Sequence, residues 1–184
     1  GSGAIFSGST RLGATGGGTG DGGTVNVNLT GGRIVTNGFN AHGLVVQSIA
    51  GGGGISGIRT TSLTLGGVVA GYGNTVTVAS SSAITTYGTS ASGIIAQSIG
   101  GGGGIATSDG QVNFVGAPSA SNSRQVLVTT TGAGAVQTQG ATSFGILAQS
   151  IGGGGGAVFG PNRLLGANFG ASIAYADNVG IDTG

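Results

Sequence analysis

Cysteine, lysine and glutamate are all absent from this chain of 184 residues. Without cysteine, the protein has neither a disulfide bond nor a thiolate metal site. Cysteine usage therefore does not indicate whether the protein resides in an oxidising or a reducing compartment. Five arginines and four aspartates give a net charge of only +1. Proteins bind nucleic-acid backbones through clustered Lys and Arg that release counterions, so nucleic acid is not expected as a partner.

Long apolar runs are missing as well, and no run in the chain is long enough to cross a bilayer. The chain does not open with a charged and then apolar export signal. Leu and Ala never gather at a spacing of about 3.6 residues, so helices are not expected. Because a sequence repeat is cut at both ends, we expect the chain to be a piece of something longer, with any export signal outside it.

Glycine is abundant, with 46 residues, a share that usually indicates disorder because glycine loses the most backbone entropy on ordering. The apolar residues argue against disorder here. Val25, Val27 and Leu29 alternate with polar residues, as do Val76 and Val78. Alternation with a period of two is typical of a strand with two different faces, so we expect an ordered β protein.

A short phrase containing Gln-Ser-Ile occurs three times, each time before a run of glycines. Its glutamines, Gln47, Gln97 and Gln149, are 50 and 52 residues apart. A fixed period of this length indicates a repeat architecture, in which each unit stacks on the next. We therefore expect one solenoid over residues 1–184. Its parts are the tail of a preceding repeat (1–23), three repeats (24–73, 74–124 and 125–178) and the start of another (179–184).

The fold class that these patterns predict is all-β, a parallel β-helix. A repeat of about 50 residues is long for one coil of a parallel solenoid, so we expect two coils of roughly 25 residues each, and about seven coils in all. The segments 44–49, 94–99 and 146–151 are apolar on both faces. This pattern predicts a strand that is covered on both sides and is the most buried of each repeat.

Stacking would place the three glutamines at one position of successive repeats. There each side-chain amide can donate a hydrogen bond to one neighbour and accept one from the other. We favour a structural ladder over a ligand site for these glutamines. The sequence does not indicate which residues would bind a ligand. The expected ladder residues are Gln47, Gln97, Gln149, Ser48, Ser98, Ser150, Ile49, Ile99 and Ile151.

The glycine runs have three possible interpretations: a phosphate-binding loop, a flexible linker or a closely packed backbone. A Walker loop requires a lysine, which the chain lacks. A linker would not be followed at constant spacing by Ile55 and Ile105. We favour close packing, in which adjacent coils leave no room for a Cβ atom, with a polyproline-like extended form left open. The glycines concerned are Gly51, Gly52, Gly53, Gly54, Gly100, Gly101, Gly102, Gly103, Gly104, Gly152, Gly153, Gly154, Gly155 and Gly156.

No set of catalytic residues stands out. The four aspartates lie mostly far apart and at different points of the repeat, which argues against a paired-carboxylate site. His42 is the only histidine and is expected to be a turn residue rather than a base or ligand. Arg59 and Asp109, and likewise Arg124 and Asp177, occupy equivalent positions of successive repeats, by coincidence or as an aid to register. We expect no enzyme activity, no metal and no cofactor.

The segment Gly93-Ile94-Ile95-Ala96-Gln97-Ser98-Ile99, followed by five glycines and set behind the Val76-Thr77-Val78 strand, carries a family resemblance. Over residues 24–160 the chain resembles the repeats of large proteobacterial autotransporter passenger domains. The resemblance implies a right-handed parallel β-helix that is exported through the outer membrane and displayed at the cell surface, commonly as an adhesin. It also implies a membrane-anchoring barrel elsewhere in the full-length protein.

The function that we expect is therefore a non-enzymatic stalk or adhesin segment at the bacterial cell surface. Its partner would be a host or abiotic surface, recognised through a glycan or a protein, with many weak contacts spread over the repeats. The alternative is a subunit of an extracellular filament or matrix, in which exposed end coils pair from chain to chain. An enzyme would need acidic residues that converge on one face, and this reading is not favoured.

Overall fold

The structure is a computed structural model, and all of its regular elements are β-strands. Within the described residues no helix occurs that has the length and apolarity to span a bilayer. The described residues are 9–12, 20–56, 62–67, 69–107, 111–114, 121–132, 135–160, 164–165, 174–175 and 179–183.

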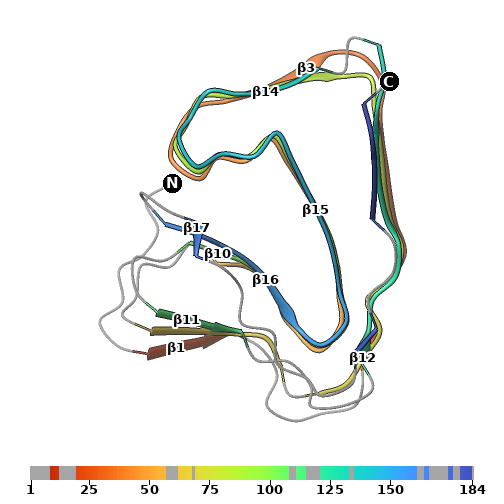
Figure 1. Cartoon of the computed structure of the whole chain (residues 1–184), viewed down its shortest axis with the longest axis vertical. Coiled ribbons are helices and arrows are strands. Elements are labelled where there is room, and N and C mark those ends of the chain that lie inside the picture. Colours follow the sequence, from red (N-terminus) through yellow and green to blue (C-terminus); the bar gives the residue numbers. More distant parts are fainter. Residues whose placement is uncertain are drawn as a thin grey trace.

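The strands stack in sheets, and all paired strands except one antiparallel pair come from successive repeats (Figure 1). The valine sheet contains β2 (Val25–Leu29), β7 (Val76–Ser80), β13 (Val126–Thr130) and β19 (Val179–Asp182). The corner sheet contains β3 (Arg33–Thr36), β8 (Ala83–Thr86) and β14 (Val136–Thr138). The central sheet contains β4 (Leu44–Ile49), β9 (Ile94–Ile99) and β15 (Ile146–Ile151).

Further along each repeat lie the remaining sheets. The glycine sheet contains β5 (Gly53–Ser56), β10 (Gly103–Thr107), β16 (Gly155–Phe159) and β17 (Leu164–Leu165). The outer sheet contains β1 (Ser9–Leu12), β6 (Ser62–Leu65) and β11 (Gln111–Phe114). A short pair contains β12 (Ser121–Asn122) and β18 (Ala174–Tyr175).

Pairing is parallel throughout these sheets, except between β16 and β17. Val25 lies opposite Val76, and Val76 lies opposite Val126. Each residue thus pairs with the residue one whole repeat away, so one repeat makes one course, which we define as the path from one valine strand to the next. The expectation of two coils per repeat, and therefore of about seven coils, is wrong, because no described strand pairs with a strand half a repeat away.

One course accommodates a whole repeat because the chain runs back through its own middle. Figure 1 shows β15 crossing the section with β16 beside it, so that the central sheet lies inside the course. Since side chains alternate along a strand, Val46 packs against the valine sheet while Val45 packs towards the glycine sheet. All six residues of β9 are buried. The predicted burial on both faces is confirmed for β9. The expectation that this strand is the most buried of each repeat is wrong for the third repeat, because five of the six residues of β15 are half-buried whereas all of β16 is buried.

Burial depends on the position of a course in the stack. Val76, Val78, Val126 and Val128 are fully buried, whereas Val27 of the first course is only partly buried. A middle course is covered by neighbours on both sides, and the first described course lacks one of them. The molecule is therefore all-β, with parallel strands stacked in register. Its core residues are most completely buried in the second course.

Candidate functional site

A row of side-chain amides, buried at Gln97 and half-buried at Gln47 and Gln149, runs through the central sheet. Gln47, Gln97 and Gln149 lie in register on β4, β9 and β15. Gln47 Nε2 donates a hydrogen bond of 2.7 Å to Gln97 Oε1, and Gln97 Nε2 donates one of 2.6 Å to Gln149 Oε1. Gln97 is fully buried, so this chain of amides replaces the water that its polar atoms would otherwise need. The glutamines are occupied with one another in a structural ladder.

The serines that follow the glutamines point to the other face of the central sheet. Ser48 Oγ donates to the Gly23 carbonyl at 2.8 Å and accepts from the Asn74 amide, also at 2.8 Å. Ser98 Oγ accepts from the Arg124 amide at 3.0 Å. These hydroxyls connect the central strand of each course to the segment that leads into a valine strand. Each serine therefore ties together parts of the chain that lie half a repeat apart.

The isoleucines that end the repeated phrase extend the core. Ile99 is fully buried and Ile151 is nearly so, whereas Ile49 of the first course is partly buried. The ladder continues in the backbone, where the Ala50 amide donates to the Ile99 carbonyl at 2.9 Å. The isoleucines thus follow the same dependence on course position as the valines.

The glycine runs make a bend and then a strand, and two physical reasons require glycine there. Gly53 and Gly103 have φ values of +137° and +136°, which L side chains rarely adopt. A Cβ atom on Gly103 would also overlap the carbonyl oxygen of Gly155 in the next course. The backbones of successive courses are therefore in close contact at Gly103. The close packing expected at Gly54 is wrong, because a Cβ atom there would meet nothing within 4 Å. The polyproline-like form left open by the sequence is wrong for these strands, because its φ has the opposite sign.

His42 is part of the interior. Its Nδ1 accepts a hydrogen bond from the Ser92 amide at 3.0 Å, and its ring lies 4.9 Å from the ring of Phe159, centroid to centroid. Phe144, at the position equivalent to His42, contacts the other side of this cluster, with its ring centroid 6.3 Å from that of Phe159. Burial lowers the pKa of His42 from 6.5 to about 4. The imidazole is half-buried, and His42 lies between the turn at residues 38–40 and the start of β4.

A turn between the corner and central sheets was missed in the sequence. Asn40, Ser90 and Thr142 occupy its equivalent position in the three courses, with φ values of +58°, +56° and +55°. Ser90 Oγ lies 2.8 Å from Thr142 Oγ1 and donates to the Gly160 carbonyl at 3.0 Å. The signal that could have found it is a glycine two residues earlier in each repeat, at Gly38 and its equivalents.

Some buried polar atoms have no hydrogen-bond partner: Asn40 Oδ1, His42 Nε2 and Ser56 Oγ. Asn40 uses its other side-chain atom, because Nδ2 donates to Thr107 Oγ1 of the next course. Asn40 and His42 belong to the first course, where Ser90 and Ser92 stand in the second. Asn40 and His42 of the first course therefore each keep one buried polar atom without a hydrogen-bond partner, whereas the hydroxyls of Ser90 and Ser92 form hydrogen bonds.

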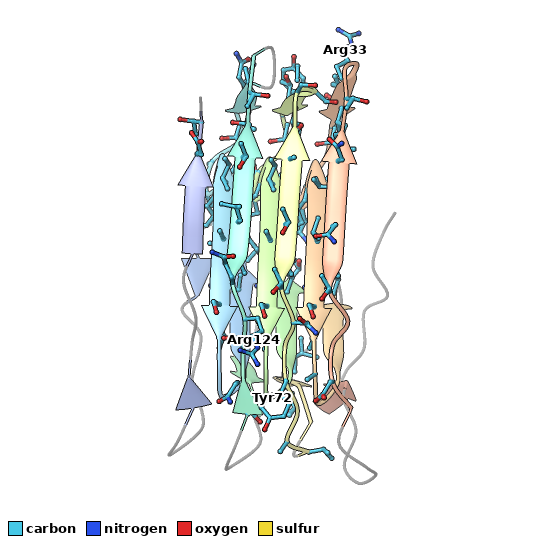
Figure 2. All side chains as sticks on the ribbon, turned by 90° about the vertical axis from the view of Figure 1, so that its right-hand side faces the viewer. Arg33, Tyr72 and Arg124 are labelled. Carbon is cyan, nitrogen blue, oxygen red and sulfur yellow. The ribbon has the colours of Figure 1, made fainter. Side chains whose placement is uncertain are left out.

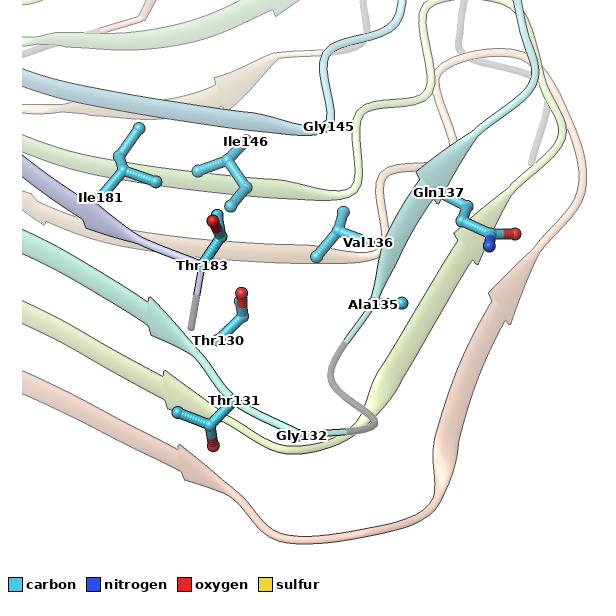
Figure 3. Close-up of a pocket in the computed structure, with 10 residues that line it drawn as sticks. All are labelled: Thr130, Thr131, Gly132, Ala135, Val136, Gln137, Gly145, Ile146, Ile181 and Thr183. Carbon is cyan, nitrogen blue, oxygen red and sulfur yellow. The ribbon is translucent and has the colours of Figure 1, made fainter.

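A pocket of about 680 Å³ with a mixed polar and apolar lining opens beyond the third course, between the valine, corner and central sheets (Figure 3). Its floor is formed by Val136 and Ile146, which face the core in their own course, and Ile181 of β19 forms part of its wall. Thr130 and Thr183 contribute hydroxyls to the lining. Within the described residues, no further strand pairs with β14 or β15 on this side of the stack.

Charged groups are sparse over the part of the chain that the structure describes. No three residues among His, Cys, Asp and Glu lie together there in a way that could hold a metal ion. Asp21 Oδ1 accepts a hydrogen bond of 2.8 Å from the Tyr72 amide. The charge pairings expected from the sequence involve Arg59, Asp109 and Asp177, which lie outside the described residues.

Comparisons with protein-family models, with curated proteins and with solved structures gave no match.

Proposed function

We propose that this chain is a right-handed parallel β-helix that serves as a non-enzymatic stalk or adhesin segment at a bacterial cell surface, within an exported, outer-membrane-anchored protein of the autotransporter type. The observation that carries the proposal is the unbroken register of the courses. In the central sheet, residues from Leu44 to Ile49 pair one for one with Ile94 to Ile99, and these with Ile146 to Ile151. A stack of this kind extends by adding courses, each about 4.8 Å thick.

The interior supports this function because its polar groups are used for stacking. The side-chain amide of Gln97 accepts a hydrogen bond from Gln47 and donates one to Gln149 in the neighbouring courses. The Ser98 hydroxyl accepts a hydrogen bond from the Arg124 amide. Glycine backbones of successive courses meet without side chains between them. Contacts to a host or abiotic surface, through a glycan or a protein, would then be made by the outer faces and repeated along the rod.

The number of courses provides the test. Variants are displayed on cells with residues 74–124 deleted, present once or present twice, and rod length is measured by electron microscopy alongside adhesion to coated surfaces. We expect the rod to lengthen by about 5 Å for each added course and adhesion to rise with it. A duplication of residues 74–98 alone is the matched control, because half a course breaks the register and should lower stability.

The stalk function and the adhesin function are each contradicted by a different result. A rod length that does not follow the number of courses contradicts the stalk, and adhesion that stays the same after the courses are removed contradicts the adhesin.

The second candidate is a filament subunit, and the open pocket favours it. Val136, Ile146 and Ile181 line a surface that a course of a second copy would cover, while Ile55 is 57% exposed at the other end of the stack. Sedimentation velocity over a hundredfold range of concentration, with electron microscopy, separates the candidates. Growth into long fibres, abolished by Ile146→Glu, supports the filament, and monodisperse short rods at all concentrations exclude it.

A further inference from the structure

The corner of the stack carries a group of exposed apolar side chains. Val35, Phe39 and Tyr87 are 43%, 51% and 48% exposed. Val35 belongs to β3, and the two aromatic residues lie in the segments that follow β3 and β8. Figure 1 shows these strands at the outside of the section, so their outward side chains face solvent. Half of the large exposed apolar residues of the described chain thus gather at one corner.

Strand register brings the three residues together. Val35 pairs with Thr85, and the Tyr87 amide donates to the Thr36 carbonyl at 3.0 Å. The pairing continues past the turn, where the Asn40 amide donates to the Thr89 carbonyl at 3.0 Å. Tyr87 therefore lies opposite Asn37, which stands two residues from both Val35 and Phe39 in the first course.

The fold does not require apolar residues at these positions. Tyr87 is replaced by asparagine and glutamine in the neighbouring courses, at Asn37 and Gln139. Val35 is replaced by Thr85 and Gln137, which lie in register with it. Ile55 and Ile181 differ, because they pair with the buried residues Ile105 and Val128 and so occupy core positions in the first and last of the described strands of their sheets. The aromatic surface at the corner is therefore not explained by packing, and an exposed cluster of this kind indicates an interaction site.

The groups around the aromatic rings are polar and uncharged. Asn37, Gln137 and Gln139 are exposed amides, and Thr85 and Thr89 are partly exposed. Among the described residues of the corner, Arg33 at the start of β3 carries the only charge. Figure 2 shows Arg33 at one end of the molecule and Tyr72 and Arg124 at the other. A partner matched to this surface would be neutral, with an apolar face and many hydroxyl groups.

We propose that this corner surface, formed by Val35, Asn37, Phe39, Thr85, Tyr87, Gln137 and Gln139, binds a neutral pyranose chain. The C–H face of a sugar ring would stack on Tyr87, and the amides would donate to and accept from its hydroxyls. The inference rests on the adhesin function proposed above, for which it names the partner class. Tyrosine suits the role because it supplies a large contact area at a low cost in side-chain entropy.

Calorimetric titration of the whole chain with cellohexaose, maltohexaose and chitohexaose tests the assignment. We expect at least one of these neutral oligosaccharides to bind, and we expect Tyr87→Ala and Phe39→Ala each to weaken its binding by roughly tenfold. Tyr87→Phe keeps the ring and should weaken binding less. Tyr72→Ala is the matched control, because it removes a tyrosine of similar exposure from the far end of the molecule and should leave binding unchanged.

Circular dichroism and thermal melting establish that each variant is folded. Wild-type protein that binds none of the three oligosaccharides overturns the inference, as does a folded Tyr87→Ala variant that binds like wild type or an equal loss in Tyr72→Ala. Adhesion that depends on the courses without oligosaccharide binding leaves the adhesin function standing and removes this partner. Oligosaccharide binding without any course-dependent adhesion supports the corner site and removes the adhesin function.

Discussion

Gln47 donates its side-chain amide to Gln97 across 50 residues of sequence, at a distance of 2.7 Å. The bond joins two courses at a point where the surrounding residues are apolar, and Gln97 passes the same interaction on to Gln149. A buried amide that donates and accepts in this way fixes the register between neighbours, because a shift by one residue would leave its polar atoms unpaired.

Gln97→Ala is expected to lower the free energy of unfolding by about 2–4 kcal/mol, because it removes a fully buried side chain and leaves the amides of Gln47 and Gln149 without their partner. Denaturant unfolding followed by circular dichroism measures the change. Gln137→Ala removes an exposed amide and should stay within about 0.5 kcal/mol of wild type. Equal effects of the two substitutions would contradict the ladder.

Gly104 and Gly54 separate the two reasons for glycine, because both have a φ of +132°. A Cβ atom on Gly104 would overlap the carbonyl of Gly54, whereas a Cβ atom on Gly54 would meet nothing within 4 Å. Gly54→Ala should therefore cost only the backbone strain, and Gly104→Ala should cost about 1–3 kcal/mol more. Thermal unfolding of both variants measures the difference. An equal loss in both would mean that backbone conformation alone selects glycine.

Stability should fall as the pH drops below the usual pKa of histidine. Burial lowers the pKa of His42 from 6.5 to about 4, so between these values the unfolded chain binds more protons than the folded one. The stabilisation from the neutral ring is fully present above pH 6.5 and is lost as the pH falls towards 4. Melting temperatures at pH 7 and pH 5 provide the measurement. His42→Phe, which copies Phe144 of the third course, should reduce this dependence, and an unchanged pH profile would refute it.

Ile84 and Ile34 stand in register on β8 and β3 and test the effect of course position. Ile84 is fully buried in the second course, whereas Ile34 is only partly buried in the first. We expect Ile84→Ala to cost about 2–5 kcal/mol and Ile34→Ala roughly half as much, because less apolar surface is lost from a site that water already reaches. Equilibrium unfolding in urea would show the difference, and a larger cost for Ile34→Ala would be incompatible with this stack.

Much of the stacking could be predicted because it repeats in the sequence. The alternation of Val25 and Val27 marks a strand, and the common phrase around Gln47 and Gln97 marks the residues that meet. The size of a course could not be predicted in this way. Whether one repeat makes one coil or two depends on the central sheet running back through the middle, which is a matter of packing between segments and leaves no periodic signal.

The candidate binding surface was hidden for a related reason. Tyr87 and Phe39 belong to different repeats and to different positions within them, so no sequence pattern joins them. They become neighbours only through the register of β3 with β8 and the turn that follows. The equivalent position of Tyr87 in the neighbouring courses holds Asn37 and Gln139, so the fold does not require an aromatic ring there.

The sequence by itself determined which residues stack, because strand alternation and a fixed period are properties of the chain. Only the tertiary structure decided how deeply each residue is buried and which glycines are indispensable. Ile105 is fully buried and Ile55 is exposed although they pair directly, because Ile105 pairs with a strand on either side and Ile55, within the described residues, pairs with a strand on one side. Burial is a property of neighbours, and in a stack the neighbours are supplied by other repeats.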